Sequence, residues 1–268
     1  MDEQTIDTRL LANPDDDELA VLADALQVLG DPRGELIALE LAGRPFTLAY
    51  GLSFHRGWYE LEFSYSAHYL LEWTQVAPWI RTIRVHAAAE LLERFLEDMC
   101  AQCTNLETLS LQINGPFTPT EACESIQWAL DVSPRLRTFE LHCDRSQIRP
   151  LDHRTLRCLR ARDSTAARVL LRSAAEYPPV SESRWPMVTE LVVDDLHHGD
   201  RLELLHLPAL RVLDFSNADS DRATAITLDN LDGLANLREL RLPARITPSS
   251  AERLVRITAA LPRVRVVR

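Results

Sequence analysis

The segment LETLSLQIN at residues 106–114 places leucines at its first, fourth and sixth positions. In an extended segment successive side chains alternate between two faces, so Leu109 and Leu111 share one face while Ser110 and Gln112 share the other. This alternation is typical of a strand with one buried face. Because self-similarity at a fixed period indicates a repeat architecture, the recurrence of this pattern decides the fold.

The same spacing of apolar residues can be placed nine times along the chain, the last instance being truncated. The instances begin at Trp58, Ile80, Leu106, Leu136, Leu156, Val188, Leu210, Leu237 and Val264. Consecutive starts lie 20 to 32 residues apart. Most of these steps fall near the period of about 20–29 residues that is typical of leucine-rich repeats.

Helical stretches are expected between the strands. The clear ones are 88–101, 119–131, 165–176 and 249–260. A strand plus a helix in each step predicts an α/β leucine-rich repeat solenoid over residues 44–268. Its parallel concave sheet would contain about nine strands, and its helices would cover the convex side. The competing fold is a doubly wound α/β sheet, but the chain lacks the Gly-rich first turn typical of that class.

Residues 1–43 are expected to form a small N-terminal helical cap. Ile6, Leu10 and Leu11 share one face of a short first helix. Asp15 and Glu18 have the spacing of a capping box, which predicts the start of a second helix.

A third helix is predicted to follow directly. Gly30 occupies the position of a C-terminal cap, and Asp31-Pro32 fits the N-cap and first residue of the next helix. We expect this helix to end near Gly43. Residues 33–42 are apolar almost all round, which predicts a largely buried helix.

The runs NPDDD at 13–17, LADAL at 22–26 and GDPRGELI at 30–37 resemble the short bacterial repeat-companion domain. That domain is found at the N-terminus of repeat proteins, often leucine-rich ones. The resemblance covers about 40 residues, and GDPRGE is its most specific part. Ala25 replaces the family's Trp, and Gln27-Val28 replaces its usual acidic pair. The run FHRGW at 54–58 resembles the family's segment before the first repeat strand. The family has no catalytic residues, so the resemblance implies an architecture.

Composition limits the class of protein. The 268 residues are 46% hydrophobic and 26% charged, which is ordinary for a globular protein. No apolar run has the length of a membrane span, and the acidic N-terminus resembles no secretory signal. Five cysteines without an export signal predict reduced thiols. We therefore expect a cytoplasmic protein with no membrane association.

All 29 basic residues are arginine, so the chain is free of lysine. One interpretation is a GC-rich genome, which favours Arg codons. The other is selection against lysine, as in a regulatory subunit of a lysine-directed enzyme such as a protease or ligase in bacterial defence or signalling. In either case Schiff-base chemistry on lysine is excluded.

Candidate chemistry is sparse, and we expect neither catalysis, nor a metal, nor a cofactor. Cys100 and Cys103 have a CxxC spacing, but zinc would need a further pair of ligands, so packing is the favoured interpretation. His142-Cys143 are neighbours on a strand and point to opposite faces, which disfavours a nucleophile pair. His197-His198 fits a polar loop. Asp194-Asp195 and Asp214 are interpreted as solvated carboxylates.

The concave face is the predicted partner-binding surface, because the residues between the apolar positions point out of the sheet. The predicted contact residues are Glu60, Glu62, Arg84, His86, Gln112, Glu140, His142, Arg160, Arg162, Glu190, Asp194, Asp214, Glu239 and Arg241. Their order along the sheet predicts charge bands that run from acidic through mixed and basic to acidic.

These features favour a non-catalytic protein–protein interaction scaffold or recognition subunit. An alternative is binding of nucleic acid or another polyanion through the Arg-rich segment 135–172, which holds ten arginines and four acids. The acidic pI near 5.2 and the lack of interleaved aromatics weigh against that alternative. The oligomeric state is left open.

Overall fold

A computed structural model of the chain shows an α/β solenoid. The described residues are 1–48, 51–64, 75–114, 119–143, 151, 153, 156–161, 185–194, 207–217, 235–243, 259 and 262–267. The predicted helices at 165–176 and 249–260 lie outside this part of the chain, apart from Ala259.

The described α-helices lie either before the sheet or between its strands, and one short 3-10 turn precedes the third strand. They are α1 (Glu3–Leu11), α2 (Asp16–Leu29) and α3 (Pro32–Leu41) before the sheet, a short 3-10 turn (Ala77–Trp79), and α4 (Ala89–Cys100) and α5 (Pro119–Asp131) between strands. Among the described residues, no helix combines the length and the apolar character needed to cross a bilayer.

Within the described ranges, ten strands form one sheet in strictly sequential order. They are β1 (Leu52–His55), β2 (Trp58–Ser64), β3 (Ile80–Ala88), β4 (Thr108–Asn114), β5 (Thr138–Cys143), β6 (Cys158–Ala161), β7 (Glu190–Val193), β8 (Val212–Asp214), β9 (Glu239–Arg241) and β10 (Arg265–Val267). From β2 to β10 every neighbouring pair is parallel, and only β1 runs antiparallel to its neighbour. All nine predicted strand positions are therefore confirmed.

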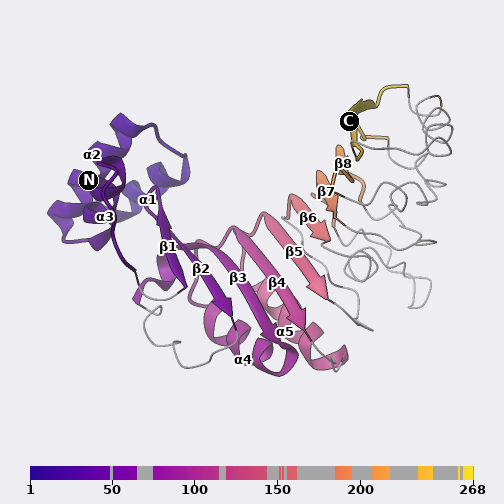
Figure 1. Cartoon of the computed structure of the whole chain (residues 1–268), viewed down its shortest axis with the longest axis horizontal. Coiled ribbons are helices and arrows are strands. Elements are labelled where there is room, and N and C mark those ends of the chain that lie inside the picture. The colour runs from indigo at the N-terminus through magenta and orange to yellow at the C-terminus, as the bar shows by residue number, and fades with distance from the viewer. Residues whose placement is uncertain are drawn as a thin grey trace.

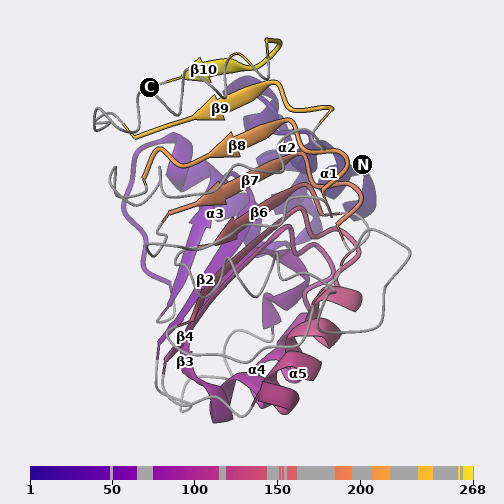
Figure 2. The ribbon, with the colours of Figure 1, turned by 90° about the vertical axis from the view of Figure 1, so that its right-hand side faces the viewer.

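The strands follow one another in a curved row, with α4 and α5 on its outer side and α1–α3 at one end (Figures 1 and 2). This arrangement follows from the register, which aligns the central apolar residue of each repeat, as in Ile83, Leu109 and Phe139. The doubly wound alternative is wrong, because such a sheet reverses its strand order part-way and this one does not.

The hydrophobic core lies between the sheet and the helices on its outer side. Leu109 and Leu111 of β4 point into it together with Phe95 of α4 and Ile126 of α5. Phe63 of β2 stacks on Phe95, with ring centroids 4.7 Å apart. The buried cluster continues from α1 to β9 without a break. Each repeat therefore buries its apolar face against its neighbours, as a solenoid requires.

The predicted starts of α2 and α3 are confirmed by their caps. The Asp15 carboxylate accepts a hydrogen bond from the Glu18 backbone N–H at 2.9 Å. The Asp31 carboxylate accepts one from the Arg33 N–H, also at 2.9 Å. Gly30 ends α2 in the left-handed region with φ 75°, which glycine adopts without a steric penalty.

The prediction that residues 33–42 are largely buried is wrong. Only Arg33, Gly34 and Ile37 of α3 are buried, and Leu41 at its end is exposed. Gly34 is required by the close approach of α2, since a Cβ there would lie 2.6 Å from the Ala23 carbonyl oxygen. The helix therefore contacts its neighbours through a glycine, a buried arginine and Ile37 rather than through a continuous apolar surface.

The sequence pattern missed β1, which forms a hairpin with β2. Its two-residue turn is Arg56-Gly57, with φ of 50° and 90°, the positive values that a type I′ turn needs. The Arg56 N–H donates to Glu40 Oε2 at 2.8 Å, and its guanidinium donates to Asp16 at 2.8 Å and to the Pro14 carbonyl. These contacts hold arginine in a conformation that it rarely adopts, and they attach the helical cap to the sheet.

Candidate functional site

The face of the sheet opposite the core carries the candidate site. We call this surface the polar face, and its predicted contact residues within the described chain are Glu60, Glu62, Arg84, His86, Gln112, Glu140, His142, Arg160, Glu190, Asp194, Asp214, Glu239 and Arg241. Most are half-buried and alternate with fully buried apolar residues along their strands. Arg162 lies outside the described residues.

The sheet register aligns these side chains in rows that cross the strands. In the central row Arg84 pairs with Ser110, Ser110 with Glu140, and Glu140 with Arg160. Aligned residues on neighbouring strands lie about 4.8 Å apart. Side chains that lie 20 or more residues apart in the sequence, on neighbouring repeats, therefore lie side by side on the polar face.

Arg160 is the centre of the first charged cluster. Its Nε donates to Asp194 Oδ2 at 2.9 Å and its Nη2 donates to Asp194 Oδ1 at 3.2 Å, so the carboxylate is held by two parallel bonds. The Glu140 carboxylate lies 3.8 Å away on the other side, and Ser110 Oγ donates to it at 3.1 Å. The hydrogen bond to Asp194 raises the pKa of Arg160. This arrangement fixes both the position and the charge of the guanidinium.

Arg241 is the centre of the second charged cluster. It contacts Glu239 at 2.6 Å, Asp214 at 2.9 Å and Glu190 at 3.2 Å, and so joins β7, β8 and β9. The hydrogen bonds to Glu239 and Asp214 raise its pKa. Burial opposes ionisation of Asp214, but hydrogen bonds from Ser216 and from Arg241 lower its pKa overall. Arg241 and Asp214 therefore both stay ionised at neutral pH.

The interpretation of Asp194 and Asp214 as solvated carboxylates is wrong. Asp214 is only 7% exposed, and both carboxylates are ion-paired with an arginine. Asp195, which the prediction grouped with Asp194, lies outside the described residues. The strand register explains the position of Asp214, because it aligns Asp214 with Arg241 of the next repeat. Asp194 lies just after β7, within reach of the Arg160 guanidinium from the preceding repeat.

The two clusters leave the polar face with an excess of negative charge. Five carboxylates surround the two guanidinium groups. At the other end Arg84 pairs with Glu60 at 2.9 Å, while Glu62 lies exposed beside them. The predicted basic band is therefore not a free basic surface, since its described member Arg160 is neutralised by carboxylates.

The cysteines of the CxxC pair lie in the core. Cys100 ends α4, and Cys103 follows it in the same buried cluster. Cys158 is partly buried at the start of β6. Burial raises the pKa of Cys100 and Cys158 to about 12, and it also raises the pKa of Cys103. Such thiols are poor nucleophiles at neutral pH, because the thiolate is the reactive form.

We expect Cys100, Cys103 and Cys158 to react with a disulfide reagent at pH 8 at least about tenfold more slowly in the native protein than in urea.

The raised pKa of these thiols also predicts how the free energy of unfolding depends on pH. The unfolded thiols ionise above about pH 8.5 while the native ones stay protonated, so the free energy of unfolding should fall as pH rises from there towards 12. Mass spectrometry of labelled peptides and urea midpoints at two pH values measure both effects. Fast native labelling of Cys100 or Cys103 would contradict this account.

The other candidate chemistry finds little support in the described chain. His142 lies on the polar face beside Gln112, but the Cys143 side chain and His197-His198 lie outside the described residues. Within the part that is described, no group of three His, Cys, Asp or Glu side chains is arranged to hold a metal ion.

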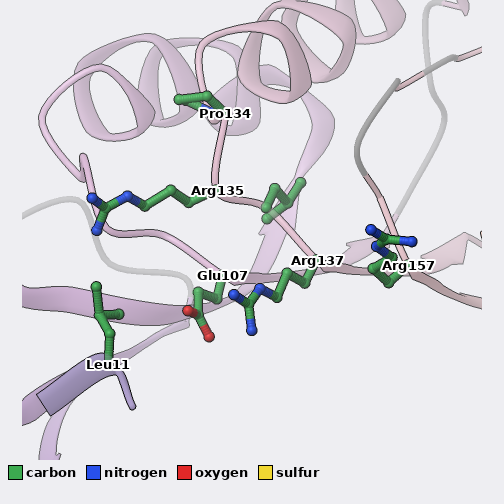
Figure 3. Close-up of a pocket in the computed structure, with 7 residues that line it drawn as sticks. Leu11, Glu107, Pro134, Arg135, Arg137 and Arg157 are labelled. Carbon is green, nitrogen blue, oxygen red and sulfur yellow. The ribbon is translucent and has the colours of Figure 1, made fainter. Parts of the chain in front are cut away.

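An open cleft of about 540 Å³ lies at the edge of the sheet where the strands begin (Figure 3). Arg135, Arg137 and Arg157 line it together with Glu107 and, from α1, Leu11. These three arginines belong to the Arg-rich segment 135–172, the alternative polyanion site predicted from the sequence, which did not place them in a cleft. A signal for them exists, because an arginine directly follows the first leucine in the repeats that start at Leu136, Leu156, Leu210 and Leu237.

A scan against protein-family models finds no match, and a search of curated proteins finds no relative of significant similarity.

Proposed function

We propose that this chain is a leucine-rich repeat protein that acts as a non-catalytic scaffold and binds a protein partner on its polar face. The resemblance of residues 1–43 to the bacterial repeat-companion domain supports the family and a bacterial origin. The free cysteines support a reducing compartment such as the cytoplasm.

The observation that carries this proposal is the ordered set of charges on the polar face. Partly exposed ion pairs contribute only about 0–1 kcal/mol each to stability. Their positions are nevertheless fixed by contacts between strands far apart in sequence, as between Arg241 and Glu190. A fixed charge pattern on an extended sheet suits recognition, because electrostatic complementarity sets specificity and association rate. The excess of carboxylates favours a partner with a basic surface.

The polyanion alternative concerns the Arg-rich segment 135–172, and the described polar-face arginine of that segment, Arg160, gives it little support. Arg160 is held by two carboxylates, and the excess negative charge around it would repel phosphates. The hypothesis of a lysine-directed enzyme stays a prediction, and the identity of the captured partner tests it.

The test is affinity capture from native lysate with quantitative mass spectrometry. The Glu62→Arg/Gln112→Arg variant adds bulk and positive charge to the polar face. The matched control is Glu97→Arg/Gln102→Arg, because these exposed residues lie in and just after α4, away from the polar face. We expect a protein captured by the wild type and the control to fall at least about tenfold with the polar-face variant, since like charges in an interface cost several kcal/mol.

Two outcomes would contradict the proposal. In one, the control variant loses the same protein, which would place binding on the helical side. In the other, every captured protein is retained by the polar-face variant. Thermal melts of both variants establish that each remains folded.

A further inference from the structure

A repeated arginine lies at the edge of the sheet where the strands begin. Arg137, Arg157, Arg211 and Arg238 directly precede β5, β6, β8 and β9. Thr189 holds the equivalent position before β7. All four arginines are exposed. We call these four residues the arginine ladder.

The backbone arranges the ladder in register. The Arg157 N–H donates to the Arg137 carbonyl at 2.8 Å, and the Thr189 N–H donates to the Arg157 carbonyl at 2.9 Å. The Arg211 and Arg238 N–H groups each donate to the preceding position in the same way, at 2.8 Å. Because the same hydrogen bond recurs at each position, the side chains leave the backbone in a common direction, about 4.8 Å apart on neighbouring strands.

Among the residues that the structure describes, the ladder differs from the arginines of the polar face in lacking acidic partners. Arg137, Arg157 and Arg211 have no side-chain hydrogen bond or ion pair to another residue in the described ranges. Arg238 donates only to two nearby backbone carbonyls. At an earlier position of the same edge, Arg81 is instead neutralised by Glu107 at 2.7 Å. Like charges on neighbouring strands repel, so a bound anion would relieve this repulsion.

The cleft beside Arg137 and Arg157 indicates the chemistry of the ligand (Figure 3). Leu11, Pro134 and Leu136 line it together with the guanidinium groups, so it offers room for an apolar side chain next to carboxylate sites. The Glu107 carboxylate also lines the cleft, but Arg81 neutralises it. Among the described residues that line it, none is aromatic, so they offer no ring on which a base could stack. The net charge of −11 also opposes a long polyanion. These features favour an acidic polypeptide over a nucleic acid.

We propose that the arginine ladder binds an extended acidic segment of a protein, with two carboxylates four residues apart. The pairs Arg137/Arg157 and Arg211/Arg238 are separated by three strand spacings, about 14 Å. Four residues of extended chain span about 13 Å, and residues at this even spacing share one side. Each carboxylate would then lie between two guanidinium groups, which bind it through charge-assisted hydrogen bonds. This surface is distinct from the polar face, and the inference does not rest on the proposed function.

Fluorescence anisotropy with the full-length protein tests this inference. The probe is a labelled peptide of Val, Thr and Ser with two glutamates four residues apart. A second peptide of the same composition has the glutamates three residues apart, which places them on opposite sides. We expect the first peptide to bind at least tenfold more tightly, and its affinity to fall as salt rises.

Variants locate the site. Arg137→Gln/Arg157→Gln and Arg211→Gln/Arg238→Gln should each weaken binding at least tenfold, while Arg44→Gln, an exposed arginine in the chain before the sheet, should not. Circular dichroism establishes that the variants are folded. Three results would overturn the proposal: no saturable binding, equal affinity for the two peptides, or tighter ladder-dependent binding of a single-stranded oligonucleotide.

Discussion

The Arg33→Ala variant should lose about 3–5 kcal/mol of unfolding free energy, the cost of breaking a buried ion-paired network. The Arg33 side chain is 0% exposed and donates to Asp31 at 2.7 Å and to Asp7 at 2.7 Å. Its guanidinium carbon also lies 4.6 Å from the ring centroid of Trp79. Burial opposes its charge, but the hydrogen bonds to Asp31 and Asp7 raise the pKa of Arg33 overall. Removing it leaves Asp31 nearly buried without its partner.

Urea unfolding followed by circular dichroism at neutral pH measures this loss. The matched control is Arg9→Ala, since Arg9 pairs with Glu18 at the surface of the same helical cap. That variant should lose no more than about 1 kcal/mol. Equal unfolding free energies for the two variants would contradict the stabilising role of the buried Arg33 network.

The Leu109→Ala variant should lose about 2–5 kcal/mol, because it opens a cavity in the packed repeat core. Leu109 is 0% exposed at the centre of β4, between Ile83 and Phe139 on the neighbouring strands. Leu29→Ala is the matched control, since Leu29 is 50% exposed at the end of α2. Its loss should remain within about 1 kcal/mol. An unchanged melting curve for Leu109→Ala would mean that the repeat register is wrong.

The strands were predictable because one face of each is buried. A shift of one residue would move Leu109 and Leu111 from the core to solvent, so the alternation fixes the register strongly. The helix starts at Asp15 and Asp31 were predictable for a local reason, because each carboxylate caps a backbone N–H two or three residues away. These helix starts can be predicted from the sequence because the residues that interact are close along the chain.

The features that sequence reasoning missed depend on contacts between distant residues. Arg56 adopts a positive φ because Glu40 and Asp16, from the helical cap, bind its N–H and guanidinium. The ion pair of Arg160 with Asp194 joins residues on neighbouring repeats that lie 34 residues apart. Because Arg160 is the fifth residue of its repeat and Asp194 the seventh of the next, aligning the repeats does not show that these two charges become neighbours.

The central claim is that the polar face contacts the partner, and carboxyl footprinting tests it most directly. Carbodiimide coupling of an amine labels exposed carboxylates, and peptide mass spectrometry reports each site with and without the captured partner. Glu62 lies exposed on the polar face, and Glu97 lies exposed on α4. We predict that the partner lowers labelling of Glu62 and leaves Glu97 unchanged. Protection of Glu97 with unchanged Glu62 would contradict the claim.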